Sequence, residues 1–246
     1  MRDHDINVFG QIIGVEIPQW SMRKAPQRID IEGHYCRLEP FSAEKHSDDL
    51  LDAFSQLEDS TWTYLAIGPF EDDASFRAWV TASALSADMF FAIVDRTTNK
   101  AIGVAALMRM DRTHGVIEIG NLHFSPALRR TRIASEAIYL LLRLVFEELR
   151  YRRCEWKCNS FNEPSRRAAA RFGFTFEGIF RQAMVVKGRN RDTAWFSIID
   201  QEWPALRGAY EAWLAPSNFD ASGRNRQKLG DLIAQARKAL SDDPST

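Results

Sequence analysis

The stretch GVIEIGNLHFSPALRRTRIASEAIYLLLRLVFEE, from Gly115 to Glu148, decides the fold. Its first part, residues 116–124, carries β-forming residues between Gly115 and the pair Ser125-Pro126, which is how a half-buried strand is bounded. Its last part repeats apolar residues at spacings of three and four, the pattern of a helix buried along one face. The stretch therefore predicts a strand, a short arginine-rich loop and a long helix.

The loop between these two elements contains Arg129, Arg130 and Arg132. Free backbone N–H groups and the positive end of the helix dipole lie at a helix N-terminus, and both attract anions. Together with three guanidinium groups they predict a site for a polyanion, with a phosphate-bearing cofactor as the expected ligand. The alternative is a solvated, charged turn that happens to precede a helix.

Length and composition limit the number of domains and the classes of function that the chain can have. A chain of 246 residues with 45% hydrophobic content can bury one full domain core with appendages at its ends. The formal net charge of −1 gives the whole chain no nucleic-acid signature. No apolar run has the length of a signal peptide or a membrane span, so we expect a cytoplasmic protein without a membrane partner. The three cysteines lack paired spacing, which indicates neither disulfides nor a metal site.

The residues before the opening stretch predict a strand and two helices, then more strands. The expected order is a strand over 35–39, a helix capped by Ser42, an irregular passage over 58–70, a second helix around 76–85, and strands over 89–95 and 101–110. Short turns join the last two strands to each other and to residues 116–124. Three successive strands with such turns are typical of an antiparallel meander.

The residues after the long helix predict a parallel crossover. A strand is expected over 151–159, and a helix between two strands is the connection of a parallel βαβ unit. A short helix follows, with Pro164 in its first turn and Gly173 past its end. The final strands are expected over 174–180, 183–187 and 193–200.

The fold class predicted is α/β (α+β), a mixed and mostly antiparallel sheet with one parallel βαβ crossover. We divide the chain into an N-terminal extension (1–33), one domain (34–203) and a C-terminal helical extension (204–246).

Two segments resemble the GNAT N-acetyltransferase superfamily, and within it the RimJ/RimL-like branch. The first is Arg129-Arg130-Thr131-Arg132-Ile133-Ala134, similar to the family loop Q/R-x-x-G-x-G/A but with Arg132 in the glycine position. The second runs from Asn162 to Phe174 and continues to Glu177-Gly178, in the form N-x-x-S…GF…EG. The resemblance covers about residues 33–203. It implies splayed central strands that hold acetyl-CoA, and direct acetyl transfer to a primary amine in a ternary complex.

The resemblance also implies which residues hold the cofactor. They are Asn121, Leu122, His123 and Phe124 on the strand, Arg129, Arg130, Thr131, Arg132, Ile133, Ala134 and Ser135 around the helix start, and Asn162 and Ser165 on the later short helix. For Asn162 and Ser165 a plain helix-capping role is the alternative.

Acetyl transfer needs a neutral amine and a proton for the departing thiolate. Glu118 is the only carboxylate within the central strand, so we expect it to act as the base, directly or through water. The alternatives are His123 as the base, no strict base at all, and an exposed Glu118 paired with an arginine. Ser165 lies near the sulfur by resemblance and could protonate it. The tyrosine that other members carry corresponds to Ala169 here and is missing.

The acceptor, a protein N-terminus or a small-molecule amine, is expected to meet Trp62, Tyr64 and Phe70 in the irregular passage. The late turn over 187–192 would form another wall. The competing reading is that these aromatic residues belong to the core.

Two other function classes stay open. One is a catalytically weak acyl-CoA-binding or regulatory module that keeps this fold. The other is association with nucleic acid or the ribosome through the basic segments 150–153 and 181–191, which the near-zero net charge disfavours. A homodimer is compatible with the sequence.

Overall fold

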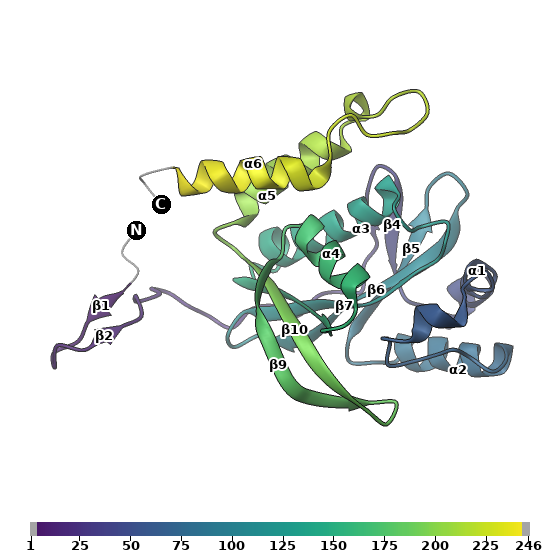
Figure 1. Ribbon diagram of the computed structural model, residues 1–246, viewed down its shortest axis with the longest axis horizontal. Coiled ribbons are helices and arrows are strands. Elements are labelled where there is room, and N and C mark those ends of the chain that lie inside the picture. The colour runs from purple at the N-terminus through teal and green to yellow at the C-terminus, as the bar shows by residue number, and fades with distance from the viewer. Residues whose placement is uncertain (1–3, 243–246) are drawn as a thin grey trace.

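A computed structural model describes residues 4–242, so the outermost positions of both predicted extensions lie outside the described part (Figure 1). Its centre is an eight-stranded sheet in the order β3-β4-β5-β6-β7-β8-β10-β9. The strands are β3 (Ile31–Glu32), β4 (Cys36–Pro40), β5 (Met89–Asp95), β6 (Lys100–Asp111), β7 (Val116–Phe124), β8 (Arg153–Asn159), β9 (Thr175–Val186) and β10 (Arg189–Ile199). All neighbours in the sheet pair antiparallel except β7 and β8. The predicted fold class, with one parallel crossover, is confirmed.

The parallel pair β7–β8 opens part of the way along its length. Pairing starts at Val116 opposite Arg153 and ends at Glu118 opposite Glu155. Beyond that point β7 continues to Phe124 and β8 to Asn159 without pairing to each other. The central strands therefore splay apart, as the sequence resemblance implied.

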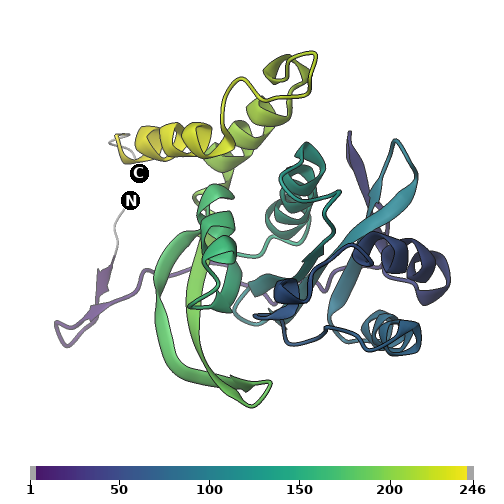
Figure 2. The same ribbon diagram turned by 45° about the vertical axis from the view of Figure 1, so that its right-hand side comes forward.

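Helices cover both faces of the sheet (Figures 1 and 2). They are α1 (Ala43–Phe54), α2 (Asp73–Ala84), α3 (Arg132–Arg143) with a π-helical turn after it (Leu144–Glu148), α4 (Glu163–Arg171), α5 (Trp203–Leu214) and α6 (Leu229–Ser241), with 3-10 turns at Asp59–Trp62 and Pro216–Asn218. Ser42 caps α1 as expected, with its side chain accepting a hydrogen bond from the backbone N–H of Lys45. Helices α1 and α2 pack over one face of β5 and β6, while α3, α5 and α6 belong to the larger core on the other face.

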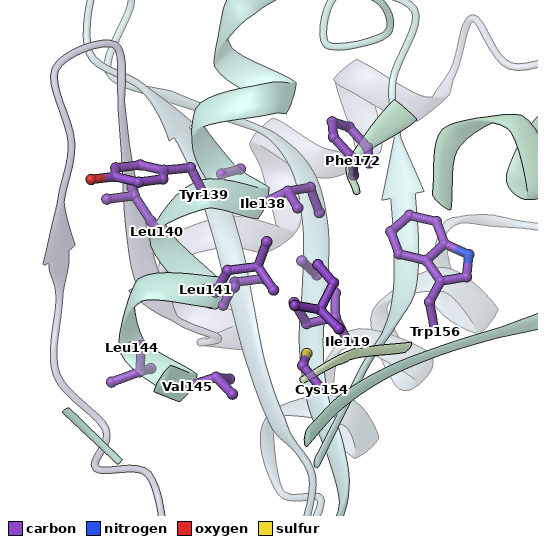
Figure 3. Close-up of a cluster of buried hydrophobic side chains, with 14 of the residues drawn as sticks. Ile119, Ile138, Tyr139, Leu140, Leu141, Leu144, Val145, Cys154, Trp156 and Phe172 are labelled. Atoms are coloured by element: carbon purple, nitrogen blue, oxygen red, sulfur yellow. The ribbon is translucent and has the colours of Figure 1, made fainter. Parts of the chain in front are cut away.

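The larger core forms because α3 is apolar along the side that meets the sheet. Ile119 of β7 and Cys154 of β8 point toward α3, where Ile138 and Leu141 lie (Figure 3). Each of these side chains is at most 1% exposed. Burying a side chain of this size contributes about 1.5–3 kcal/mol, so this contact fixes the helix against the splayed strands.

The structure departs from the sequence prediction in the strands after α4, and it adds short strands within residues 1–33. Strand β9 is one continuous strand where two were predicted, over 174–180 and 183–187. The pairing with β10 shifts register around Gln182, which has a φ of 50° and whose N–H donates to Asp192 Oδ1 at 2.7 Å. The predicted break between two strands is therefore a bulge within one strand. Helix α5 lies almost entirely in the C-terminal extension (204–246) that was expected to be helical, and its Trp203 and Tyr210 are buried in the larger core.

The N-terminal segment begins with a small hairpin of β1 (Asp5–Ile6) and β2 (Ile12–Ile13), which stands apart from the main sheet at the left of Figure 1. The chain then runs along the β6–β7 turn, where Trp20 Nε1 donates to the carbonyl oxygen of Thr113 at 2.8 Å. Between residues 4 and 242, no helix combines the length and the apolar character that crossing a membrane would need.

Candidate active site

The free edge of β7 is the first part of the site. The register with β6 pairs Gly120 with Ala106 and His123 with Val104, so β7 contains an extra residue between these pairs. Asn121 lies in this bulge with a φ of 48°. Bulges re-aim a strand edge next to binding sites. One edge of residues 119–124 pairs with β6, and the other edge has no strand partner beyond Glu118, so an extended molecule with amide groups could pair with that free edge as an added strand.

The start of α3 is the second part. Thr131 caps the helix, its hydroxyl accepting from the N–H of Ala134 at 3.2 Å. The N–H groups of Arg132 and Ile133 belong to the first turn, where no intrahelical acceptor exists. The preceding loop is fixed because the Leu128 and Arg129 N–H groups both donate to the Ser125 carbonyl oxygen. These free donors fit a phosphate group.

The three loop arginines do not act as one cluster. Arg129 Nε donates to the Phe124 carbonyl oxygen at 3.0 Å, and its Nη2 donates to Thr61 Oγ1 at 3.3 Å. The Arg132 guanidinium lies over the ring of Tyr35, 4.3 Å from the centroid, and near Phe219. Arg130 is exposed, has a φ of 62° and makes no ion pair within residues 4–242. Of the guanidinium groups expected at the phosphate, only that of Arg130 is uncommitted.

The remaining residues predicted to bind the cofactor at the start of α3 are partly or fully buried and pack within the protein. Ile133 is half-buried and Ala134 is buried in the larger core. Ser135 is fully buried, and its Oγ accepts a hydrogen bond from Arg171 Nη2 at 2.8 Å. This bond joins α3 to α4 behind the loop.

The start of α4 lies beside the end of β8. Asn162 Oδ1 accepts from the Ser165 N–H at 3.2 Å, so Asn162 caps the helix, which was one of its two expected roles. Ser165 Oγ accepts from Trp156 Nε1 at 3.0 Å. Burial raises the pKa of the Cys158 thiol, and a hydrogen bond with Ser165 partly opposes that rise. The Ser165 hydroxyl is therefore held at the β8 side of the splay.

Glu118 lies at the vertex of the splay and is buried, not exposed as one alternative supposed. Its Oε2 is 2.7 Å from Arg109 Nη1 and 3.1 Å from Lys157 Nζ. Both of these cations therefore contact the same carboxylate oxygen, Oε2. A Cβ at Gly120 would come within 3.3 Å of Oε1 and 2.5 Å of the Met108 sulfur, so glycine keeps the space beside Oε1 open.

Lys157 extends this charged group across the sheet. Its Nζ is also 2.6 Å from Glu155 Oε2 and lies 3.8 Å from the centroid of the Trp195 ring. Neither Lys157 nor Arg109 was predicted from the sequence. The alternation of Cys154, Trp156 and Cys158 on one face could have placed Lys157 on the opposite face, where Glu118 lies.

His123 is buried between two indole rings. Its ring centroid is 6.1 Å from that of Trp62 and 5.2 Å from that of Trp79. Neither ring nitrogen finds a hydrogen-bond partner within residues 4–242. Burial lowers the pKa of His123 to about 4, so the ring is neutral at pH 7. A buried imidazole of this kind takes up a proton poorly.

The aromatic residues predicted to contact the acceptor belong in part to the smaller hydrophobic core. Trp62 is buried in the smaller core, and its ring meets that of Phe70 at a centroid distance of 5.3 Å. Tyr64 and Phe70 are half-buried. The tip of the β9–β10 hairpin reaches this wall through Lys187, whose Nζ is 2.9 Å from the Trp62 carbonyl oxygen. Lys187 was within the turn expected to form the second wall.

The fold is that of an acetyl-CoA-dependent N-acetyltransferase. The family description "Acetyltransferase (GNAT) domain" matches residues 36–175, and the chain belongs to this family. It is 31% identical to the SPbeta prophage-derived uncharacterized N-acetyltransferase YokL of Bacillus subtilis (strain 168), over 54% of this chain and 75% of that protein.

Two further comparisons give similar proteins. The crystal structure of a GCN5-related N-acetyltransferase from Brucella melitensis is 49% identical, with a TM-score of 0.86, and covers 89% of this chain and 100% of its own. The putative ribosomal N-acetyltransferase YdaF of Bacillus subtilis (strain 168) is 24% identical over 68% of this chain and 90% of that protein.

Proposed function

We propose that this chain transfers an acetyl group from acetyl-CoA to a primary amine by direct transfer in a ternary complex. The observation that carries the proposal is the splay of β7 from β8, with Glu118 at its vertex. The free edge of β7 and the start of α3 suit a long cofactor with a phosphate end. The face of the sheet that carries Glu118 suits the acceptor. Both reactants could then meet at one point without a covalent enzyme intermediate.

The cysteines support direct transfer. Cys36, Cys154 and Cys158 are the only cysteines of the chain, and all are buried. Burial raises the pKa of each thiol, which keeps it in the protonated, weakly nucleophilic form. A cysteine acetyl carrier therefore has no support in this chain.

We assign the proton steps to Glu118 and Ser165. Glu118 Oε1 would accept the proton of the incoming amine, directly or through a water molecule, while Arg109 and Lys157 hold Oε2 in place. Ser165, fixed by Trp156, would donate a hydrogen bond to the departing sulfur, which would take its proton from solvent water. Those main-chain N–H groups of residues 121–124 that lie on the free edge would polarise the carbonyl, an effect of about 3 kcal/mol for a well-aimed donor.

The acceptor remains a primary amine of a protein N-terminus or a small molecule. YdaF is named a putative ribosomal N-acetyltransferase, which supports a protein N-terminus and the RimJ/RimL-like branch as the first class to assay. The cytoplasmic location and a homodimer stay predictions.

The test is the release of free thiol from acetyl-CoA across N-terminal peptides, polyamines, aminoglycosides and amino-acid derivatives. Intersecting initial-rate lines are expected for direct transfer, and parallel lines would contradict it. Glu118→Gln should lower turnover and change its pH profile, with Glu148→Gln on the exposed side of the π-helical turn as the control. Stabilisation by CoA without thiol release on any amine would instead favour the acyl-CoA-binding module.

A further inference from the structure

Strand β10 carries a row of polar atoms without protein partners. Arg191, Thr193 and Trp195 are spaced two residues apart, so they share one face of the strand. Arg191 Nε, Thr193 Oγ1 and Trp195 Nε1 are each buried, and each lacks a hydrogen-bond partner within the described residues. Buried polar groups are nearly always satisfied, so three in a row point to a ligand that satisfies them.

This row lies on the same face of the sheet as Glu118. Trp195 is the register partner of Lys157, whose Nζ lies over the Trp195 ring and 3.1 Å from Glu118 Oε2. The intervening Ala194 belongs to the larger core on the opposite face. Arg191 lies past the end of the β8 pairing, where the Ser160 N–H donates to the Asp192 carbonyl oxygen at 2.8 Å. The row therefore extends from beside Glu118 to the open end of the splay.

The charges of the row call for an anion. Arg191 is half-buried and forms no ion pair in the described part of the chain. Burial lowers the pKa of its guanidinium, Cys158 opposes that change, and Arg109 and Glu118 have smaller effects in opposite directions. Arg109 is itself committed to Glu118. A guanidinium partly removed from water and lacking a counter-ion is destabilising unless a ligand supplies the charge.

The donor types narrow the ligand further. Guanidinium and indole groups only donate hydrogen bonds, and the threonine hydroxyl can donate as well. A group that accepts from all three and carries negative charge is an oxyanion. Carboxylate and phosphate both match the planar fork of an arginine.

We propose that the acceptor is a primary amine that also carries an oxyanion, a carboxylate or a phosphate, held by Arg191 with Thr193 and Trp195 while its amine faces Glu118. This proposal rests on the proposed function and names the substrate class of the same site. It makes Arg191 a specificity residue that acts on acceptor binding.

The experiment compares acceptors that differ only in the anion. Free amino acids are paired with their amides, and phosphoethanolamine with ethanolamine. We expect kcat/KM to be about tenfold higher for the anionic member of at least one pair, as one charge-assisted hydrogen bond would give. Preference in the first pair identifies a carboxylate, and preference in the second identifies a phosphate.

Variants locate the anion. Arg191→Gln should reduce the preference to about twofold or less by raising the acceptor KM, with the KM for acetyl-CoA unchanged. Arg191→Lys should keep part of the preference for the anionic acceptor. Arg181→Gln, at an exposed position of β9, is the control and should keep the full preference. Equal rates for both members of every pair, or a preference untouched by Arg191→Gln, would overturn the proposal.

A binding readout separates this proposal from the proposed function. With saturating CoA present, inorganic phosphate should raise the melting temperature of the wild type and not of Arg191→Gln. This rise in melting temperature would support the anion site even if no amine is acetylated. Absence of acetylation would count only against the proposed function. An equal phosphate response in both proteins would exclude Arg191. If Arg191→Gln does not fold, Thr193→Val replaces it.

Discussion

Lys187 Nζ lies 2.9 Å from the carbonyl oxygen of Trp62, and the two residues come from distant parts of the chain. The same ammonium group is 3.2 Å from the Ile67 carbonyl oxygen and also contacts that of Gly68. One side chain thus joins the tip of the β9–β10 hairpin to the loop between α1 and α2. These two segments are the walls expected for the acceptor, so their distance apart depends on Lys187.

Removing this ammonium should loosen the acceptor wall. Lys187→Met keeps the length of the side chain and loses three charge-assisted hydrogen bonds. We expect the acceptor KM to rise about fivefold or more, because about 1 kcal/mol of acceptor binding free energy would be lost. The KM for acetyl-CoA should stay unchanged. Hydrogen exchange over residues 62–68 should also accelerate. Lys100→Met, at an exposed position, is the control, and unchanged exchange in Lys187→Met would contradict the role of the contact.

Arg130 and Arg132 should differ in their effect on the cofactor, although they are neighbours. Arg130 is exposed and uncommitted, while the guanidinium of Arg132 is stacked on Tyr35. Arg130→Gln should raise the KM for acetyl-CoA about fivefold with little change in kcat, because a phosphate contact is worth about 1 kcal/mol at an exposed helix start. Arg132→Gln should change this KM less and lower the melting temperature instead. Equal effects of both variants on the KM would show that Arg132 turns toward the phosphate.

Glu136 fixes the start of the sheet to α3, and its loss should destabilise the fold. Its carboxylate accepts backbone hydrogen bonds from His34, Tyr35 and Cys36, each at 2.7 Å. Glu136→Gln removes the charge and turns an NH₂ group toward at least one of these N–H donors. We expect a loss of about 3 kcal/mol in the free energy of unfolding, measured by chemical denaturation. Glu148→Gln, exposed at the end of the π-helical turn after α3, should change this free energy by less than about 0.5 kcal/mol. A similar small loss in Glu136→Gln would contradict this role.

The sequence predicted those elements whose pattern is local. Strands β5 and β7 have the bounds expected from their apolar residues and their flanking turns. The parallel crossover followed from one long helix between two strands, and the caps of α1 and α4 from Ser42 and Asn162. In each of these cases, the residues that determine the structure are near neighbours in the chain.

The site was harder to predict because its side chains are directed by distant partners. Arg132 turns to Tyr35 and Phe219, so its position at a helix start did not reveal its contact. Glu136 carried a signal, since it is a charged residue on the apolar side of α3, where only a buried set of donors could hold it. Arg191 had the opposite problem. Within the basic segment 181–191 it resembled a solvated charge. It is placed on the Glu118 side of the sheet only by its spacing of two residues from Thr193, which pairs with Asn159 of β8.

His123 should make the fold less stable in acid and should not be needed as the base. Its pKa is about 4 in the folded protein and about 6.5 in the unfolded chain, because burial between two indole rings disfavours the charged imidazole. Above pH 6.5 the ring is neutral in both states and contributes nothing to the pH dependence. Between pH 6.5 and 4 the unfolded chain takes up a proton that the folded protein does not, so the free energy of unfolding falls.

The loss attributable to this ring is about 3 kcal/mol by pH 4, after which the folded protein is protonated too and the decline stops. His123→Phe keeps an aromatic ring between Trp62 and Trp79 and removes the titrating group. Chemical denaturation at a series of pH values should therefore give a difference between wild type and variant that changes by about this amount from pH 7 to pH 4. If the unfolding free energies of wild type and variant change with pH in parallel, water or a neighbouring group stabilises the charged imidazole in the folded protein. Thiol release by the variant at pH 8 should persist, whereas its loss in a folded variant would restore His123 as the base.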